Sequence, residues 1–309
     1  MSDALISIVL PTYNGAKYLE QALQSVVEQT HEKWELIVVD SYSQDATPDI
    51  VARYAGLDAR IRAMQHPKES GRLPGALNAG FAQAQGIYHT WLSDDNYFRP
   101  HSLSTMADYL DQHRDIGVVY TDFTCVDAEG KFLRKTPARS PSLLMEKNVI
   151  TPSFLYRREV HETLGGYRVE YFLSEDYDFW LRARSVARVQ PLHEDCHVYR
   201  VHDQSLTAGY TADIAHASEL ALLDCIKHST WMSRNDKARA YVFMSRLARK
   251  QDARDRQRQY WIKAAQLSPY LIVRRGLLAG MSRILGQGSS RRISRIYVGI
   301  KRRLGLDEQ

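Results

Sequence analysis

The chain has 309 residues, of which 44% are hydrophobic and 25% charged, and its formal net charge is +5. This composition is ordinary for a globular protein, and the length allows one large domain or one domain with a smaller appendage. The three cysteines have no Cys-x-x-Cys spacing, the N-terminus shows no leader, and no apolar run reaches the length of a membrane span. We therefore expect a cytoplasmic protein, or one bound peripherally to the inner face of the plasma membrane.

The first part of the chain alternates between strand-like and helix-like segments. Residues 5–10 form an apolar run that predicts a buried strand ending at Pro11, and residues 34–39 predict a second strand. Between them, apolar residues recur at helical spacing over residues 19–27, and Pro48 suits the first turn of a following helix. This alternation predicts a mostly parallel sheet with right-handed crossovers.

The rest of the chain continues this pattern and then becomes helical. Further strands are predicted over residues 61–64, 87–92, 115–120, 153–156 and 197–202, and helices over residues 76–81 and 175–182. The turn at residues 127–130 predicts an antiparallel hairpin, and residues 241–269 are typical of a helical hairpin. We predict an α/β domain over residues 1–209 and a basic helical region over residues 210–309.

Polar residues follow several of the predicted strands. Asp94 and Asp95 come after the strand over residues 87–92, and Asp40 ends an earlier one. The ends of parallel strands converge on one side of a sheet, so we expect these side chains to lie close together. Adjacent carboxylates suit Mg²⁺ or Mn²⁺ bridging to a substrate diphosphate. The alternative is that Asp94 and Asp95 form a turn and cap the next helix.

Seven segments in consistent order resemble the family-two glycosyltransferases, which have the GT-A fold. They are SIVLPTYN at residues 7–14, ELIVVD at 35–40, GALNAG at 75–80, SDD at 93–95, LGGY at 164–167, SEDYDFWLR at 174–182 and YRVH at 199–202. Together they cover about the first 205 residues. The resemblance implies a Rossmann-like, mostly parallel sheet flanked by helices, with residues 1–209 as the catalytic domain and a helical extension after it.

The resemblance implies that the first two strand ends hold the base and ribose of a nucleotide-diphospho-sugar. Tyr13 would offer its ring and hydroxyl, Asp40 would accept hydrogen bonds, and Arg72 would contact a phosphate. The residues assigned to this donor are Pro11, Tyr13, Asp40, Arg72, Asn78 and Asp94. The alternatives are that Tyr13 packs beside a turn, that Asp40 caps a loop, and that Arg72 is a solvated surface residue.

The resemblance also implies a metal and a general base. Asp95 would coordinate Mn²⁺ or Mg²⁺ with Asp94 nearby, and His202 would be a further contact, or else a structural hydrogen-bonding residue. Asp176 matches the family's general base, which deprotonates the acceptor hydroxyl in one inverting displacement. Glu175 is the alternative base or an acceptor contact. Both acids could instead simply favour a helix N-terminus.

Two positions depart from the family pattern. Residues 41–43 read Ser-Tyr-Ser where the family often has an acid followed by Gly-Ser, which leaves the donor's base open. Leu92 stands where many members have the first acid of an extended Asp-x-Asp-Asp, so the metal site rests on fewer carboxylates.

The resemblance to the family-two enzymes implies an inverting, metal-dependent glycosyltransferase of the hexosyltransferase type. Its donor would be a UDP-, GDP- or dTDP-sugar, and its acceptor a glycan or lipid-linked glycan in bacterial surface polysaccharide assembly. One alternative is a nucleotidyltransferase on a related fold, although residues 11–15 lack its glycine-rich basic loop. The other is a non-catalytic sugar-nucleotide-binding scaffold, which the set Asp40, Asp94, Asp95 and Asp176 disfavours.

Basic residues gather in the C-terminal region. Over residues 293–304, apolar residues recur at helical spacing between arginines and lysines, which predicts a basic amphipathic helix. Such a helix can lie on an anionic membrane surface, or pack on its own domain with a solvated charged face. We do not expect nucleic acid as a partner, because no stacking-aromatic or recognition-helix motif accompanies the charge.

Overall fold

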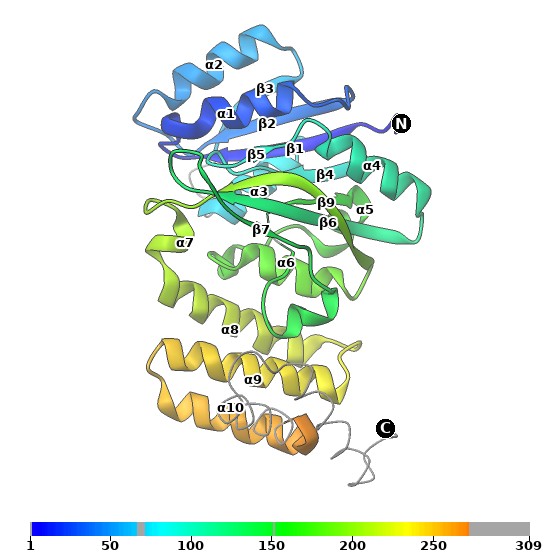
Figure 1. Ribbon diagram of the computed structural model, residues 1–309, viewed down its shortest axis with the longest axis vertical. Coiled ribbons are helices and arrows are strands. Elements are labelled where there is room, and N and C mark those ends of the chain that lie inside the picture. Colours follow the sequence, from blue (N-terminus) through cyan, green and yellow to red (C-terminus); the bar gives the residue numbers. More distant parts are fainter. Residues whose placement is uncertain (1, 67–71, 151, 272–309) are drawn as a thin grey trace.

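The computed structural model describes residues 2–66, 72–150 and 152–271, and its fold begins with alternating strands and helices (Figure 1). These elements are β1 (Ile6–Thr12), α1 (Ala16–Val27), β2 (Trp34–Asp40), α2 (Thr47–Leu57), β3 (Ile61–Gln65), α3 (Arg72–Phe81) and β4 (Tyr88–Trp91). β1 lies between β2 and β4 and is parallel to both, and β3 is parallel to β2. The predicted parallel arrangement is confirmed.

The second part of the sheet mixes strand directions. Its elements are β5 (Tyr97–Phe98), α4 (Ser102–Gln112), β6 (Ile116–Val126), β7 (Phe132–Thr136), the 3₁₀-helix η1 (Pro141–Met145), β8 (Phe154–Arg157), α5 (Arg158–Leu164), η2 (Val169–Tyr171), α6 (Glu175–Ala183) and β9 (Arg188–Arg200). The strand order is β3-β2-β1-β4-β8-β6-β9-β5, with β8 antiparallel to both of its neighbours. β7 pairs with the C-terminal half of β6, which confirms the predicted hairpin.

Hydrophobic side chains of the sheet alternate between two buried clusters. Ile8 and Leu10 of β1 pack in the cluster that includes Leu23 of α1, whereas Val9 packs in the cluster that includes Leu77 of α3. This alternation follows because successive side chains of a strand point to opposite faces. Helices therefore cover both faces of the sheet, and the polar site is left to the strand ends.

β1 runs through Pro11 to Thr12, so the prediction that Pro11 ends the strand is wrong. Proline has no N–H to give to a strand ladder, and it is tolerated where no partner strand needs one. The N–H of Ile6 faces β2, and the carbonyl of Val9 faces β4. Pro11 therefore faces β4, whose pairing with β1 has already ended at Val9 and Trp91. The strand continues without losing a hydrogen bond.

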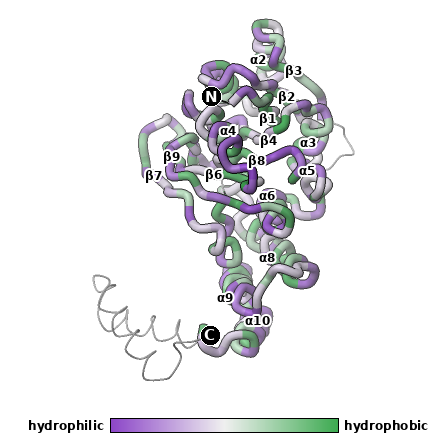
Figure 2. The backbone as a smooth tube through the Cα atoms, turned by 90° about the vertical axis from the view of Figure 1, so that its right-hand side faces the viewer, coloured by the Kyte–Doolittle hydropathy of each residue, from purple (hydrophilic) through white to green (hydrophobic). Residues whose placement is uncertain are grey.

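The C-terminal part of the described chain is a stack of helices. They are α7 (Leu206–Gly209), α8 (Thr211–His228), α9 (Arg234–Lys250) and α10 (Arg254–Leu267). Figures 1 and 2 show α8, α9 and α10 as successive layers at one end of the molecule. The predicted helical hairpin is confirmed as α9 and α10, which are joined by a turn with Asp252 at φ 53°.

Helix α8 belongs to the same hydrophobic core as the sheet. Ala221 and Leu222 are fully buried in the cluster that contains Tyr156 of β8 and Trp180 of α6. Full burial of a leucine side chain contributes roughly 1.5–3 kcal/mol. The hydrophobic core is thus continuous across residue 210, where the predicted domain boundary lies. The predicted helix over residues 293–304 lies outside the described residues.

Within the described ranges, no helix combines the length and the apolarity that crossing a lipid bilayer requires. Cys125, Cys196 and Cys225 are buried free thiols.

Candidate active site

The ends of β1, β2 and β4 meet at one edge of the sheet. Thr12 and Asp40 are the last residues of β1 and β2 and stand opposite each other in the strand register. The Thr12 hydroxyl donates a hydrogen bond of 2.6 Å to Oδ2 of Asp94, which follows β4. The structure therefore brings Asp40 and Asp94 to one edge, as the strand order predicts, with Thr12 between them.

Asp94 lies in a tight, largely buried place. Burial is the main reason why its pKa rises to about 6, and the adjacent Asp95 carboxylate raises it further. Hydrogen bonds from the Thr12 hydroxyl and the Tyr13 backbone N–H act in the opposite direction. A Cβ on Gly15 would overlap Oδ2 of Asp94, so position 15 has no room for a side chain. The glycine at the start of α1 thus makes space for this carboxylate.

The two residues predicted to hold the nucleotide differ in exposure. Asp40 is buried, and its Oδ1 accepts hydrogen bonds from the backbone N–H of Ser43 at 3.1 Å and from its hydroxyl at 2.5 Å. Its Oδ2 accepts one from Gln65 at 3.2 Å. Tyr13 is 63% exposed, so the alternative of a packed aromatic is excluded. Asp40 caps its loop, and Tyr13 presents a free ring beside it.

Ser41 and His66 occupy the place next to Asp40. The Ser41 hydroxyl lies 3.1 Å from Nδ1 of His66, and the His66 backbone N–H donates to the Asp40 carbonyl at 2.8 Å. The buried Nε2 of His66 has no hydrogen-bond partner among the described residues. Burial lowers the pKa of His66, which favours the neutral imidazole. A buried, neutral ring therefore lies beside Ser41, where the family often has a second acid.

Asp95 and His202 form a pair at the end of β9. Nε2 of His202 lies 2.9 Å from Oδ2 of Asp95, and both side chains are largely buried. Oδ1 of Asp95 is buried and has no hydrogen-bond partner in the described part of the chain. Leaving a buried acceptor unpaired costs about 1–3 kcal/mol. The pair thus presents one oxygen that a ligand would satisfy.

The Asp95–His202 pair contains two types of side chain that bind metal ions. No group of three or more His, Cys, Asp or Glu side chains converges with metal-binding geometry in the ranges described. However, Mg²⁺ is usually held by one or two carboxylates together with substrate phosphates and water. The unpaired Oδ1 of Asp95, with His202 and Asp94 beside it, fits such an ion. The metal roles of these three residues stay predictions.

Glu175 and Asp176 begin helix α6 in a buried setting. Asn148 donates a hydrogen bond of 2.8 Å to Oδ2 of Asp176, while Oε2 of Glu175 is buried and lacks a partner among the described residues. Burial raises the pKa of both carboxyls, and the charge of Asp176 raises that of Glu175 further. Acids that only favour a helix N-terminus have no need of such burial. The setting is typical of carboxyls that exchange protons.

Tyr199 is a largely buried residue of β9 that interacts electrostatically with Asp95 and with Asp176. Burial raises the pKa of its hydroxyl, and the charges of both Asp95 and Asp176 add to that rise.

The sequence of the chain matches the model of a known protein family. The model of the family "Glycosyl transferase family 2" matches residues 7–167. The chain belongs to this family. The matched range contains the Asp40 and Asp94–Asp95 strand ends, and it stops short of Asp176 and His202, which follow it in the chain.

Relatives and solved structures agree with the family. An uncharacterized glycosyltransferase of Rickettsia typhi is 28% identical over 220 residues, which are 66% of each chain. The structure of S. aureus TarS residues 1–349 with UDP-GlcNAc matches with a TM-score of 0.68 and 18% identity over 96% of this chain and 92% of that one. The structure of mannosyltransferase PcManGT from Pyrobaculum calidifontis, with GDP-Man and Mn²⁺, matches with a TM-score of 0.61 and 19% identity. The match covers 97% of this chain and 81% of that one. The GT-A fold is confirmed.

The chain spans only part of the length of the first curated relatives that it matches. The aligned segment is 66% of the Rickettsia typhi protein, and it is about a third of the length of several other rickettsial relatives.

Arg200, which lies just before His202 in the chain, supports the loop that contains Asp95. Its buried guanidinium donates to the Asp95 carbonyl at 3.2 Å, to the Asp127 and Ala128 carbonyls at 3.2 and 3.0 Å, and to Gln21 at 2.5 Å. The sequence motif contains Arg200 without indicating this role. Because the four acceptors come from three distant segments, Arg200 fixes Asp95 relative to α1 and to the β6–β7 turn.

Arg200→Lys is expected to weaken Mn²⁺-dependent nucleotide binding about tenfold or more. A lysine cannot reach all four acceptors, and a hydrogen bond from a charged group contributes about 1.5–3 kcal/mol. Titration calorimetry with and without Mn²⁺ measures the change. The matched control is Arg158→Lys, since Arg158 pairs with Glu162 on the exposed face of helix α5. Equal affinities in the two variants would show that Arg200 does not position the loop.

Arg72 and Asn78, both predicted donor residues, lie on α3. The Arg72 guanidinium stacks over the Phe172 ring at 4.7 Å, just before the acids of α6. The Asn78 amide donates to the Tyr167 carbonyl at 2.6 Å and accepts from the Tyr167 N–H at 2.8 Å. Asn78 therefore holds the turn after α5, and its contact with the donor stays a prediction. A phosphate contact by Arg72 stays a prediction.

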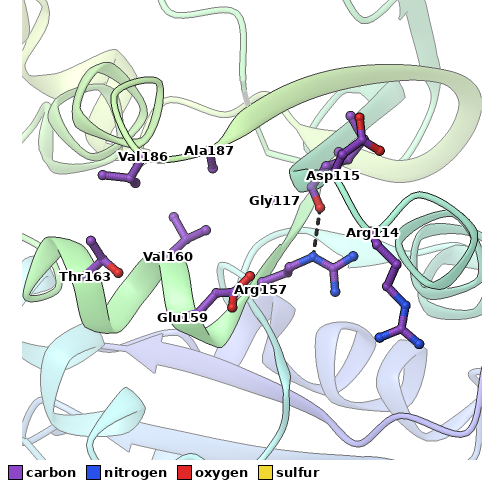
Figure 3. Close-up of a pocket in the computed structure, with 10 residues that line it drawn as sticks. Arg114, Asp115, Gly117, Arg157, Glu159, Val160, Thr163, Val186 and Ala187 are labelled. Carbon is purple, nitrogen blue, oxygen red and sulfur yellow. Dashed lines mark hydrogen bonds between the residues drawn. The ribbon is translucent and has the colours of Figure 1, made fainter.

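A separate pocket, shown in Figure 3, lies at the other ends of the central strands, near the start of β4 and β6. Its lining residues are Arg114, Asp115, Ile116, Gly117, Arg157, Glu159, Val160, Thr163, Val186 and Ala187. Arg157 pairs with Tyr88 at the start of β4, whereas Asp94 follows the end of that strand. The Arg157 guanidinium is occupied by the Ile116 and Leu110 carbonyls at 2.8 and 2.7 Å. This pocket is therefore distinct from the candidate active site.

Proposed function

We propose that this family 2 protein is an inverting, metal-dependent glycosyltransferase. It transfers a sugar from a nucleotide-diphospho-sugar to a hydroxyl group of a glycan or lipid-linked glycan, in bacterial surface polysaccharide assembly. The observation that supports this most is the Asp95–His202 pair, in which the buried Oδ1 of Asp95 has no hydrogen-bond partner among the described residues. Asp176, a buried acid with a raised pKa at the start of α6, is a second carboxylate centre.

The donor's nucleoside lies at the ends of β1 and β2. The exposed Tyr13 ring covers a face of the base, and the Asp40 loop with Ser41 and His66 supplies polar contacts at its edge. A histidine and a serine replace a carboxylate there, so the loop can both donate and accept hydrogen bonds. The same fold is recorded with UDP-GlcNAc in TarS and with GDP-Man in PcManGT, so the fold does not select the base.

The diphosphate lies against Asp94 and Asp95. Asp95, Asp94 and His202 would hold a Mn²⁺ or Mg²⁺ ion, which would supply positive charge to offset the charge of the nucleoside diphosphate leaving group. Arg200 keeps the Asp95 backbone in place, and Thr12 orients the Asp94 carboxylate. The protein's part is to fix these groups before the donor arrives, so little reorganisation accompanies the reaction.

The acceptor hydroxyl lies beside Asp176, which takes its proton as it attacks the anomeric carbon. The bond to the acceptor oxygen forms as the bond to the nucleoside diphosphate breaks, so a single displacement inverts the configuration. The Asn148 amide donates to Oδ2 of Asp176 at 2.8 Å, and the Tyr177 backbone N–H donates to Oδ1 at 2.6 Å. Each carboxylate oxygen keeps a second lone pair that can accept the proton of the acceptor hydroxyl. We assign these steps to residues 1–209, while the helices after residue 210 cover the back of α6.

Nucleotide binding should be selective and should require a metal. In calorimetry with UDP, GDP and dTDP, we expect one of the three to bind at least tenfold more tightly in Mn²⁺ than in EDTA, with donor turnover confined to the same base. Turnover of a nucleoside triphosphate with a sugar 1-phosphate would instead identify a nucleotidyltransferase. Tight donor binding with neither hydrolysis nor transfer across an acceptor panel would identify a scaffold.

A further inference from the structure

β7 is an exposed edge strand with an unusual surface. It pairs with β6 through Val126 and Phe132 at one end and Phe123 and Thr136 at the other. The side chains from residue 131 to residue 135 are all exposed. Phe132 is 61% and Leu133 46% exposed, although both are large apolar residues. In Figure 2 this strand lies at the outer margin of the molecule.

Cations surround the two apolar side chains. Lys131 precedes them, and Arg134 and Lys135 follow them, so the β7 edge (residues 131–135) has three positive charges and no acid. Lys135 lies 3.6 Å from Asp195, and its side chain is still mostly exposed. The turn before β7 contains two acids, the exposed Glu129 and Asp127, which accepts hydrogen bonds from the backbone N–H groups of Glu129 and Lys131. The β7 edge therefore combines net positive charge with exposed apolar area.

The β7 edge is rigidly connected to the candidate active site. Phe132 pairs with Val126, and Val126 pairs on its other side with Arg200. Neighbouring strands lie about 4.8 Å apart, so the backbones of Phe132 and Arg200 are about 10 Å apart. Arg200 also binds the Asp127 and Ala128 carbonyls in the turn that leads into β7. A surface that contacts the β7 edge is therefore held close to Asp95 and His202.

We propose that the β7 edge docks the protein on an anionic lipid membrane. Exposed aromatic and aliphatic side chains enter the interfacial region of a bilayer, and each lysine or arginine near an anionic surface adds about 1 kcal/mol of attraction. A second copy of the chain fits this edge less well. Lysine and arginine on a short edge strand oppose pairing with an identical strand, and the register shift between Cys125 and Val126 interrupts the ladder.

Membrane docking through β7 would present the site to an acceptor anchored in the same lipid surface. It differs from the contact predicted for residues 293–304, because it uses the edge of the sheet and brings the metal-site strand to the bilayer. Binding to vesicles requires no donor and no turnover. Failure of this inference is therefore distinguishable from failure of the proposed function.

Vesicle flotation with the full chain tests the docking. We expect binding to vesicles with 40% phosphatidylglycerol, weaker binding at high salt, and little binding to pure phosphatidylcholine. Lys131→Glu/Arg134→Glu and Phe132→Ser/Leu133→Ser should each weaken binding about tenfold or more. The matched control is Leu57→Ser/Ile87→Ser, which removes two apolar residues that are 78% and 54% exposed elsewhere. Circular dichroism and donor hydrolysis check that each variant is folded.

A label on β7 gives a second readout. The three native cysteines are buried, so Phe132→Cys can be labelled selectively with a polarity-sensitive dye. The dye emission should shift to the blue on phosphatidylglycerol vesicles, and a label at Ile87→Cys should not respond. Binding that is unchanged in both double variants, no binding of the parent chain, or equal responses of the two labels would each overturn the proposal.

Discussion

Asp95→Ala is expected to lower metal-dependent sugar transfer about a thousandfold or more. The ion contributes several kcal/mol to the stabilisation of developing charge, and about 1.4 kcal/mol corresponds to a factor of ten in rate. In the Asp95–His202 pair, Oδ1 of Asp95 is buried and has no hydrogen-bond partner among the described residues. Alanine therefore removes the atom best suited to bind the ion. Initial rates across a Mn²⁺ titration, with the donor identified by the nucleotide panel, measure the loss.

Two comparisons make this result specific. Glu129→Ala also removes one negative charge, from an exposed turn near the site, and it should leave the rate within about twofold of the parent. His202→Ala should raise the Mn²⁺ concentration needed for half-maximal rate, because His202 binds the other oxygen of the Asp95 carboxylate. If Asp95→Ala kept the parent's response to Mn²⁺, the metal site would have to lie elsewhere.

The sheet was predictable because its signals are local. Strand and helix periods are visible along residues 5–39, and the convergence of parallel strand ends then follows from topology alone. The end of β1 was not predictable from Pro11 itself. That proline is tolerated because pairing with β4 stops at Val9, which is a property of a neighbouring strand.

The details of the site depend on contacts between segments that are distant in the sequence. Thr12 meets Asp94 across 82 positions, and Arg200 reaches Gln21 across 179. No spacing rule predicts such pairs, since they follow from how helices and strands stack. Asn78 has a structural contact that its motif does not indicate, because its amide holds the backbone of Tyr167. The types of residue at the candidate site could be predicted from the motifs, whereas the hydrogen-bond partners of their side chains could not.

Asp176→Asn is expected to lower transfer by about a hundredfold to ten-thousandfold while leaving donor affinity unchanged. General base catalysis contributes a factor of about 10²–10⁴, and asparagine keeps the shape and the hydrogen bond to Asn148 but cannot take a proton. Single-turnover rates and calorimetric donor affinity separate the two effects. Glu175→Gln is the matched comparison. If it removed transfer while Asp176→Asn did not, Glu175 would be the base.

The pH dependence provides an independent test of the same residue. Burial raises the pKa of Asp176 above its ordinary value of 3.8, and only the deprotonated form can act as a base. The transfer rate of the parent should therefore rise with pH through that raised pKa and then level off, and Asp176→Asn should lose this rise.

The folded state binds this proton more tightly than the unfolded state, so the free energy of unfolding falls as pH increases through the same range. Asp176→Asn avoids that loss, and its thermal midpoint at neutral pH should be no lower than the parent's. A variant that lost transfer through misfolding would instead show a lower midpoint and weaker donor binding.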